Sequence, residues 1–71
     1  MKKYEFKITS SFDEKERIWK KRYTIKKDGS KTLLKDITVE IEKEFKPYTV
    51  LIDFKSDTEA CNWFDKTYKG Y

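Results

Sequence analysis

Alternation of apolar and polar residues is the feature that most constrains how this 71-residue chain can fold. The alternation is present in four stretches, which cover residues 3–9, 17–27, 32–45 and 48–54. A period of two places successive side chains on opposite faces of a β-strand, so that one face can be buried while the other meets water. The sequence therefore predicts four strands before residue 55.

The end of the chain changes to a helical period. Ser56 precedes Glu59 by three residues, which is the pattern of a capping box. Ala60, Trp63 and Phe64 follow at helical spacing. We expect a helix over residues 57–68 whose two large rings pack on the sheet, with Cys61 half-buried beside them.

Together these elements predict an α+β fold. We expect a four-stranded antiparallel β-meander with one C-terminal helix packed on one face, formed by a single domain over residues 1–71. Residues 10–16 form a polar connection between the first two strands, and we expect its Phe12 to fold back onto the core.

The turns predict which strand residues lie opposite one another. Asp-Gly-Ser at residues 28–30 suits a three-residue hairpin loop with its glycine at positive φ. That loop would place Ile25 opposite Leu33 and Arg22 opposite Asp36, keeping apolar residues on one face.

The turn at Lys46-Pro47 would pair the third strand with the fourth and place Glu40 opposite Asp53. The same reasoning extends the first register to Glu16 opposite Glu42. Like charges at directly opposed positions destabilise a sheet. A folded sheet would therefore tolerate these pairs only at some cost in stability.

By this register, the sheet face away from the helix is polarised. Basic residues lie toward the 28–30 loop, namely Lys20, Arg22, Lys26 and Lys31. Acidic residues gather toward the other end and are named the acidic lobe: Glu14, Glu16, Glu40, Glu42, Glu44 and Asp53. The mixed charge is also compatible with a solvated face that resists aggregation, whereas the like-charge pairs favour a binding surface.

The composition argues against catalysis. The chain has no histidine to activate Cys61 or a serine, and only two glycines, too few for a phosphate-binding loop. The carboxylates lack the spacing of a calcium loop, and no cofactor or metal is expected. One cysteine precludes an internal disulfide, and no apolar run approaches the roughly 20 residues of a membrane span, so we expect a cytoplasmic protein without membrane contact.

Residues 54–66 carry a local resemblance. Phe54, Glu59-Ala60 and the segment Phe64-Asp65-Lys66 resemble the strand-to-helix junction of the plant ethylene-response-factor DNA-binding domain. They are also similar to the arm-type DNA-binding domain of tyrosine recombinases. Both families lay a three-stranded sheet, backed by a helix, into the major groove. The resemblance implies that the face opposite the helix meets DNA, with Lys20, Arg22 and Lys26 suited to phosphate contact.

These observations leave three hypotheses of non-enzymatic function. The first is a small phage- or mobile-element-type inhibitor, similar in size and charge layout to anti-CRISPR proteins. Its acidic residues (Glu16, Glu40, Glu42, Glu44 and Asp53) would bind a basic protein partner such as a nuclease and imitate nucleic acid. The alternative is a β-sheet DNA- or RNA-binding module that uses basic residues of the second strand. The third is an assembly component that pairs through an exposed edge strand.

Overall fold

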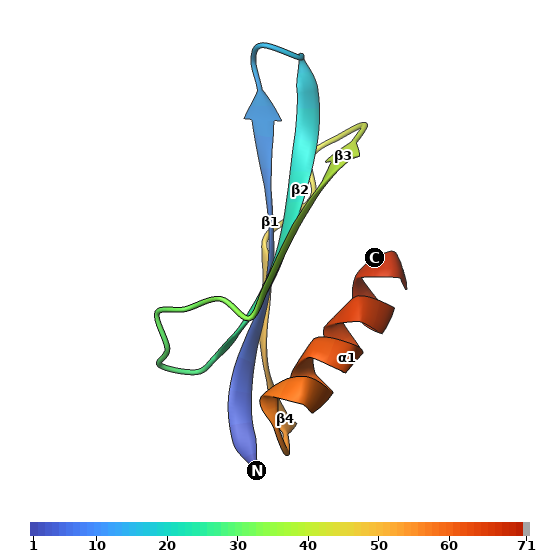
Figure 1. Ribbon diagram of the computed structural model, residues 1–71. Coiled ribbons are helices and arrows are strands. Elements are labelled where there is room, and N and C mark those ends of the chain that lie inside the picture. The colour runs from blue at the N-terminus through green and yellow to red at the C-terminus, as the bar shows by residue number, and fades with distance from the viewer. Residues whose placement is uncertain (71) are drawn as a thin grey trace.

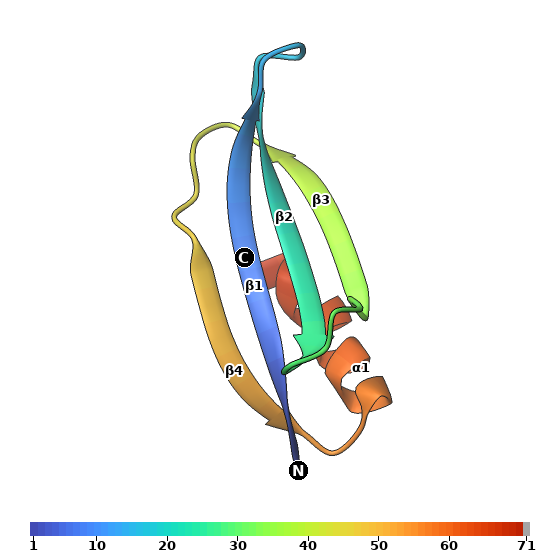
Figure 2. The same cartoon turned by 90° about the vertical axis from the view of Figure 1, so that its left-hand side faces the viewer.

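The computed structural model describes residues 1–70 and confirms the α+β class. Its elements are β1 (Lys2–Asp13), β2 (Ile18–Lys27), β3 (Lys35–Ile41), β4 (Tyr48–Phe54), α1 (Asp57–Thr67) and the 3-10 helix η1 (Tyr68–Gly70) (Figure 1). The four strands form one antiparallel sheet, and α1 packs on one face of it (Figure 2).

The strand order is β3-β2-β1-β4, so the expected meander order is wrong (Figure 2). β4 pairs with β1 instead of β3, and residues 42–47 cross from one sheet edge to the other. This arrangement gives the long β1 a neighbour on both sides, and Tyr4, Phe6 and Ile8 on its apolar face are completely buried. Ser10 holds the crossing segment, because its hydroxyl donates to the Phe45 carbonyl at 2.7 Å and accepts from the Phe45 N–H at 3.2 Å.

The expected register between β2 and β3 is wrong by two residues. Ile25 lies opposite Lys35 instead of Leu33, and the connection is the longer loop of residues 28–34. A turn closed by the Ser30 N–H and the Lys27 carbonyl starts this loop, and its Gly29 has the expected positive φ of 83°. A slip of two residues leaves each side chain on its predicted face, since the strand period is two.

The core lies between the sheet and α1. Its fully or nearly buried members are Tyr4, Phe6, Ile8, Tyr23, Ile25, Phe54, Ala60 and Phe64. Phe6 is the centre of this cluster, and its ring lies 5.0–6.4 Å from the rings of Tyr23, Tyr48, Trp63 and Phe64. Three of these contacts are edge-to-face, an arrangement that aromatic pairs favour.

The helix begins as predicted. The Ser56 hydroxyl accepts a hydrogen bond from the Glu59 N–H at 3.3 Å. Phe64 is fully buried, whereas Trp63 is only half-buried at the rim of the core, so Phe64 anchors the helix more deeply than Trp63 does. Cys61 is half-buried, as expected.

The β1–β2 hairpin extends beyond the helix (Figure 1). β1 runs to Asp13, so the expected connection at residues 10–16 is largely strand. Phe12 does not reach the core: 47% of it is exposed, and its ring packs edge-on against Trp19 at 5.5 Å. Asp13 accepts the N–H of Lys15 at 2.9 Å and thereby closes the turn.

Truncating Phe6 should therefore unfold much of the protein. Phe6→Ala removes the ring that all four neighbouring rings contact, and a buried Phe→Ala change costs about 3–5 kcal/mol. Urea unfolding measures this loss. Phe12→Ala removes the same atoms from an exposed ring and should cost no more than about 1 kcal/mol. Equal losses in the two variants would contradict the assignment of Phe6 as the centre of the core.

Tyr4 links β1 to the start of the helix, and this contact should make stability sensitive to alkaline pH. Its hydroxyl donates to the Asp57 carboxylate at 2.5 Å, and this bond, together with burial, raises the pKa of Tyr4 from 10 to about 12. The unfolded chain then ionises first, so the contribution of Tyr4 is complete below pH 10 and is lost as the pH rises to about 12. The difference in melting temperature between wild type and Tyr4→Phe should shrink over this range. A constant difference would contradict the prediction.

Candidate functional site

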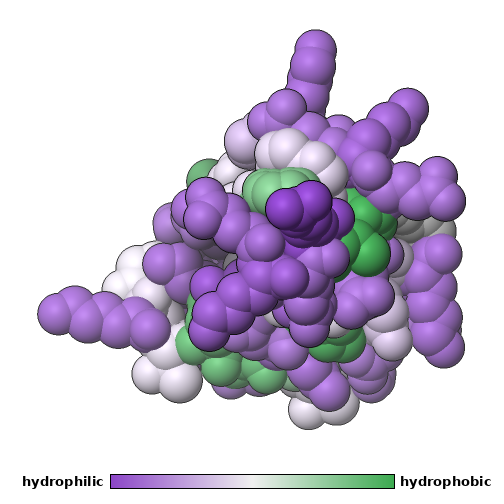
Figure 3. Space-filling view, turned by 90° about the horizontal axis from the view of Figure 1, so that it is seen from above, coloured by the Kyte–Doolittle hydropathy of each residue, from purple (hydrophilic) through white to green (hydrophobic). Residues whose placement is uncertain are grey.

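The sheet face away from α1, named here the outer face, is covered by no other element of residues 1–70 (Figure 2). Strand alternation places charged and hydroxyl side chains on it, while the strand aromatics lie on the helix side. Those aromatics are Tyr4, Phe6, Phe12, Trp19, Tyr23, Tyr48 and Phe54. Seen from the hairpin end, the molecule is mostly hydrophilic, with small hydrophobic patches between the polar side chains (Figure 3).

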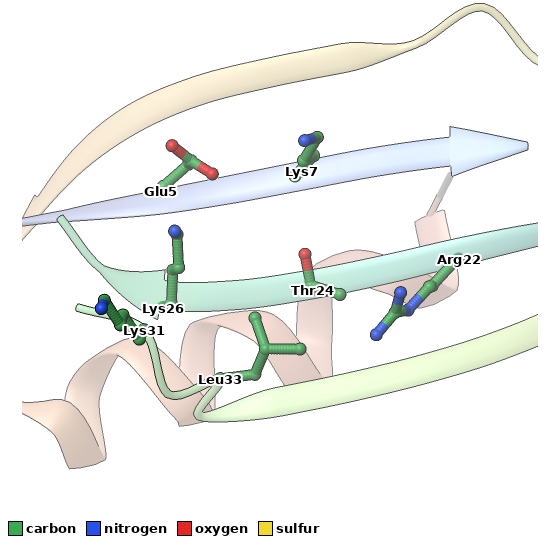
Figure 4. Close-up of a pocket in the computed structure, with 7 residues that line it drawn as sticks. All are labelled: Glu5, Lys7, Arg22, Thr24, Lys26, Lys31 and Leu33. Carbon is green, nitrogen blue, oxygen red and sulfur yellow. The ribbon is translucent and has the colours of Figure 1, made fainter. Parts of the chain in front are cut away.

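A shallow hollow of about 190 Å³ lies on the outer face and is named here the basic hollow. It is lined by Glu5, Lys7, Arg22, Thr24, Lys26, Lys31 and Leu33 (Figure 4). Two central strands and the 28–34 loop contribute these side chains. Four cationic groups thus surround one hollow that contains a single carboxylate.

The register explains the charge excess in the hollow. Lys26 lies opposite Glu5 on β1, a pairing of opposite charges. Lys7 has hydroxyl residues as its cross-strand neighbours, Thr24 on β2 and Thr49 on β4. The ammonium group of Lys7 therefore adds positive charge that no directly opposed carboxylate offsets.

Arg22 forms the expected ion pair with Asp36, although the two residues are not directly opposed. The Arg22 Nε donates to Asp36 Oδ1 at 2.9 Å, and a terminal nitrogen donates to Oδ2 at 2.6 Å. This two-pronged contact holds the pKa of Asp36 below its usual range. Both side chains stay well exposed, at 52% and 39%, so Arg22 can still contact a ligand.

Lys20 lies away from the basic hollow, unlike the predicted contacts Arg22 and Lys26. Its ammonium lies 3.2 Å from Asp13 and 3.3 Å from Glu16, and Glu40 lies opposite it on β3. Hydrogen bonds from the Glu16 N–H and then from the Lys20 ammonium lower the pKa of Asp13. The carboxylates of Asp13 and Glu16 in turn raise the pKa of Lys20. Lys20 therefore offsets acidic groups near the hairpin turn.

The like-charge pairs that defined the acidic lobe do not form. Asp53 pairs with Lys3 on β1 at 3.7 Å, and Glu40 faces Lys20 on β2. For the Glu40–Asp53 pair the reason is the strand order, which separates β4 from β3 by two strands. Glu16 and Glu42 lie outside β2 and β3, so the sheet does not pair them. Like-charge contacts are thereby replaced by opposite-charge ones, which favour the sheet.

The remaining predicted acidic residues follow β3 or lie in the hairpin turn. Glu42 and Glu44 are exposed in the crossing segment and line a second hollow of about 330 Å³. Lys21 also lines it, although its side chain is buried beneath Phe45 with the ammonium 3.7 Å from the ring centroid. Glu16 contacts Lys20 in place of the expected Glu42.

Sequence reasoning missed Lys7, Thr24 and Glu5 as members of a site. The expected meander also sets β1 beside β2, but the connection at residues 10–16 predicted no register between them, so Lys7 was not placed opposite Thr24. The signal was the alternation in residues 3–9, which places Lys7 on the same face as Arg22 and Lys26 once β1 pairs with β2 in this register.

Within residues 1–70, no group of three potential metal-ligating side chains occurs. No helix there combines the length and apolar character that crossing a membrane requires. Comparison with family models, curated proteins and solved structures found no match.

Proposed function

We propose that this protein binds double-stranded nucleic acid through its outer face, with the basic hollow against the phosphate backbone. The observation that carries the proposal is that four cationic side chains line one uncovered hollow (Figure 4). Lysine and arginine neutralise phosphates and release counterions, which supplies most of the affinity of non-specific binding. The resemblance of residues 54–66 to sheet-type DNA-binding domains implies the same face.

The absence of aromatic rings from the strand positions of the outer face favours a duplex over a single strand. Proteins that bind single strands stack bases on exposed aromatic side chains. In this sheet the strand aromatics lie on the other face, and the outer face offers cations and hydroxyl groups such as those of Thr24 and Thr49. These groups contact phosphate and sugar oxygens well.

Salt-dependent binding to a short labelled duplex tests this proposal. Fluorescence anisotropy should give a linear fall of log affinity with log salt concentration. Replacing Lys7 and Lys26 together by Gln should reduce the slope by about 2, since each phosphate contact contributes roughly 0.9. A single strand of the same length should bind more weakly.

The matched control is Lys66→Gln with Lys69→Gln. These exposed lysines lie at the C-terminal end of α1 and in η1, and the double change removes the same net charge away from the outer face. It should leave the salt slope nearly unchanged. An equal reduction in both double variants, or no duplex binding at low salt, would overturn the proposal.

The exposed acidic residues favour a second candidate function. Glu40, Glu42 and Glu44 occupy alternate, solvent-exposed positions, and Lys20 is already shared by Asp13 and Glu16. Under this proposal the protein is a phage- or mobile-element-type inhibitor, anti-CRISPR-like in size, that binds a basic nuclease in place of its nucleic acid. Neither candidate function requires catalysis.

Displacement of duplex DNA from a basic nuclease distinguishes the two candidate functions. An inhibitor should release the labelled duplex, and Glu42→Lys with Glu44→Lys should abolish this release, because attraction to the basic channel becomes repulsion. A duplex-binding protein should instead bind the free duplex more tightly after the same change. Wild-type protein that binds free duplex and releases none from the nuclease would contradict the inhibitor proposal.

A further inference from the structure

The two edges of the sheet differ in how they resist pairing with another strand. β3 carries Lys35, Asp36 and Glu40 among its seven residues. β4 is also seven residues long, but its only charged residue is Asp53, and that carboxylate pairs with Lys3 within the sheet. Charged side chains are a common protection of edge strands. The β3 edge has this protection, and the β4 edge largely lacks it.

An exposed leucine lies at the middle of the β4 edge. Leu51 is 50% exposed and points to the outer face opposite Glu5, while Val50 and Ile52 are half-buried on the helix side. In the described chain no further strand lies beyond β4. Its outward backbone groups and its apolar side chains are therefore available to another extended strand.

We propose that β4 pairs antiparallel with β4 of a second copy of this chain, with Leu51 on the two-fold axis. This register places Leu51 against Leu51 of the second copy on the outer face. On the helix side it places Val50 against Ile52, and near the ends it places Thr49 against Asp53. Apolar residues meet apolar residues on both faces, and like charges are not directly opposed.

The alternative registers are less complementary. Moving the axis to Ile52 sets Leu51 against Asp53, and moving it to Val50 sets Leu51 against Thr49. An axis between two neighbouring residues would pair each outer-face side chain of one copy with a helix-side side chain of the other copy. The two helices would then lie on opposite faces of the joined sheet. The strand is thus self-complementary about Leu51, as an isologous interface requires, and this identifies a second copy as the occupant.

The small size of the core supplies a reason for pairing. A domain of 71 residues is near the lower limit of independent stability, and oligomerisation is one way in which small domains gain buried surface. The pairing joins two four-stranded sheets into one, with both outer faces on the same side. It does not require nucleic acid, so it stands independently of the proposed function.

Cysteine cross-linking tests the register in a Cys61→Ser background. In Leu51→Cys the two introduced thiols lie directly opposite each other, where Cα atoms are about 4.5–5.5 Å apart, within the range that a disulfide spans. Mild oxidation should give a covalent dimer. Thr49→Cys is the matched control on the same face of the same strand. Its two copies would lie four residues apart along the strand, roughly 14 Å, so they should not cross-link. Equal cross-linking of both variants would overturn the register.

Sedimentation equilibrium tests the interface itself, with duplex binding measured on the same samples. Wild type should be a dimer, and Leu51→Lys should be monomeric because two ammonium groups would meet on the axis. Thr49→Lys adds the same charge on the same face but lies opposite Asp53, so it should remain dimeric. Circular dichroism verifies that both variants are folded. A monomeric wild type, or equal dissociation of the two lysine variants, would overturn the dimer whatever the duplex affinity is.

Discussion

The contacts of Phe6 with the rings around it are the interaction on which the rest of the structure depends. Phe6 is fully buried on β1, and its neighbours come from β2, β4 and α1. Rings from three other elements can surround one side chain only if β1 lies between β2 and β4 with the helix above it. The strand order and the position of the helix therefore follow from how this residue is buried.

Alternation then divides the sheet into two chemically different faces. One holds the aromatic core, and the other holds the basic hollow and its flanking carboxylates. Lys21 is a charged residue that points to the helix side, where it is buried beneath Phe45. The crossing segment that carries Phe45 thus covers a cation that would otherwise interrupt the apolar face, and the outer face keeps cations at positions where a polyanion can reach them.

The sequence predicted local features well and long-range ones poorly. The period of two assigned each strand residue to its face, and the capping box located the start of the helix, because both depend on neighbouring residues. The predicted partner of β4 was wrong, because β1 and β3 both offer alternating apolar residues and only packing around Phe6 distinguishes the two strands. The expected Glu40–Asp53 pair does not form, because it depended on pairing between β3 and β4. Arg22 and Lys26, which the sequence predicts as basic contacts, both line the basic hollow, but including Lys7 required the β1–β2 register.

The pairing of β1 with β4 also has a consequence during protein synthesis. β1 leaves the ribosome well before residues 48–54, which form one of its two neighbouring strands, and before Asp57, which accepts the hydrogen bond of Tyr4. A nascent chain can form the β1–β2 hairpin, yet the apolar face of β1 stays accessible to water and to chaperones until β4 and α1 have emerged. Contacts so distant in sequence slow folding. Completion of the core therefore waits until β4 and α1 have emerged, and chains that terminate before residue 48 expose the Phe6 surface to aggregation.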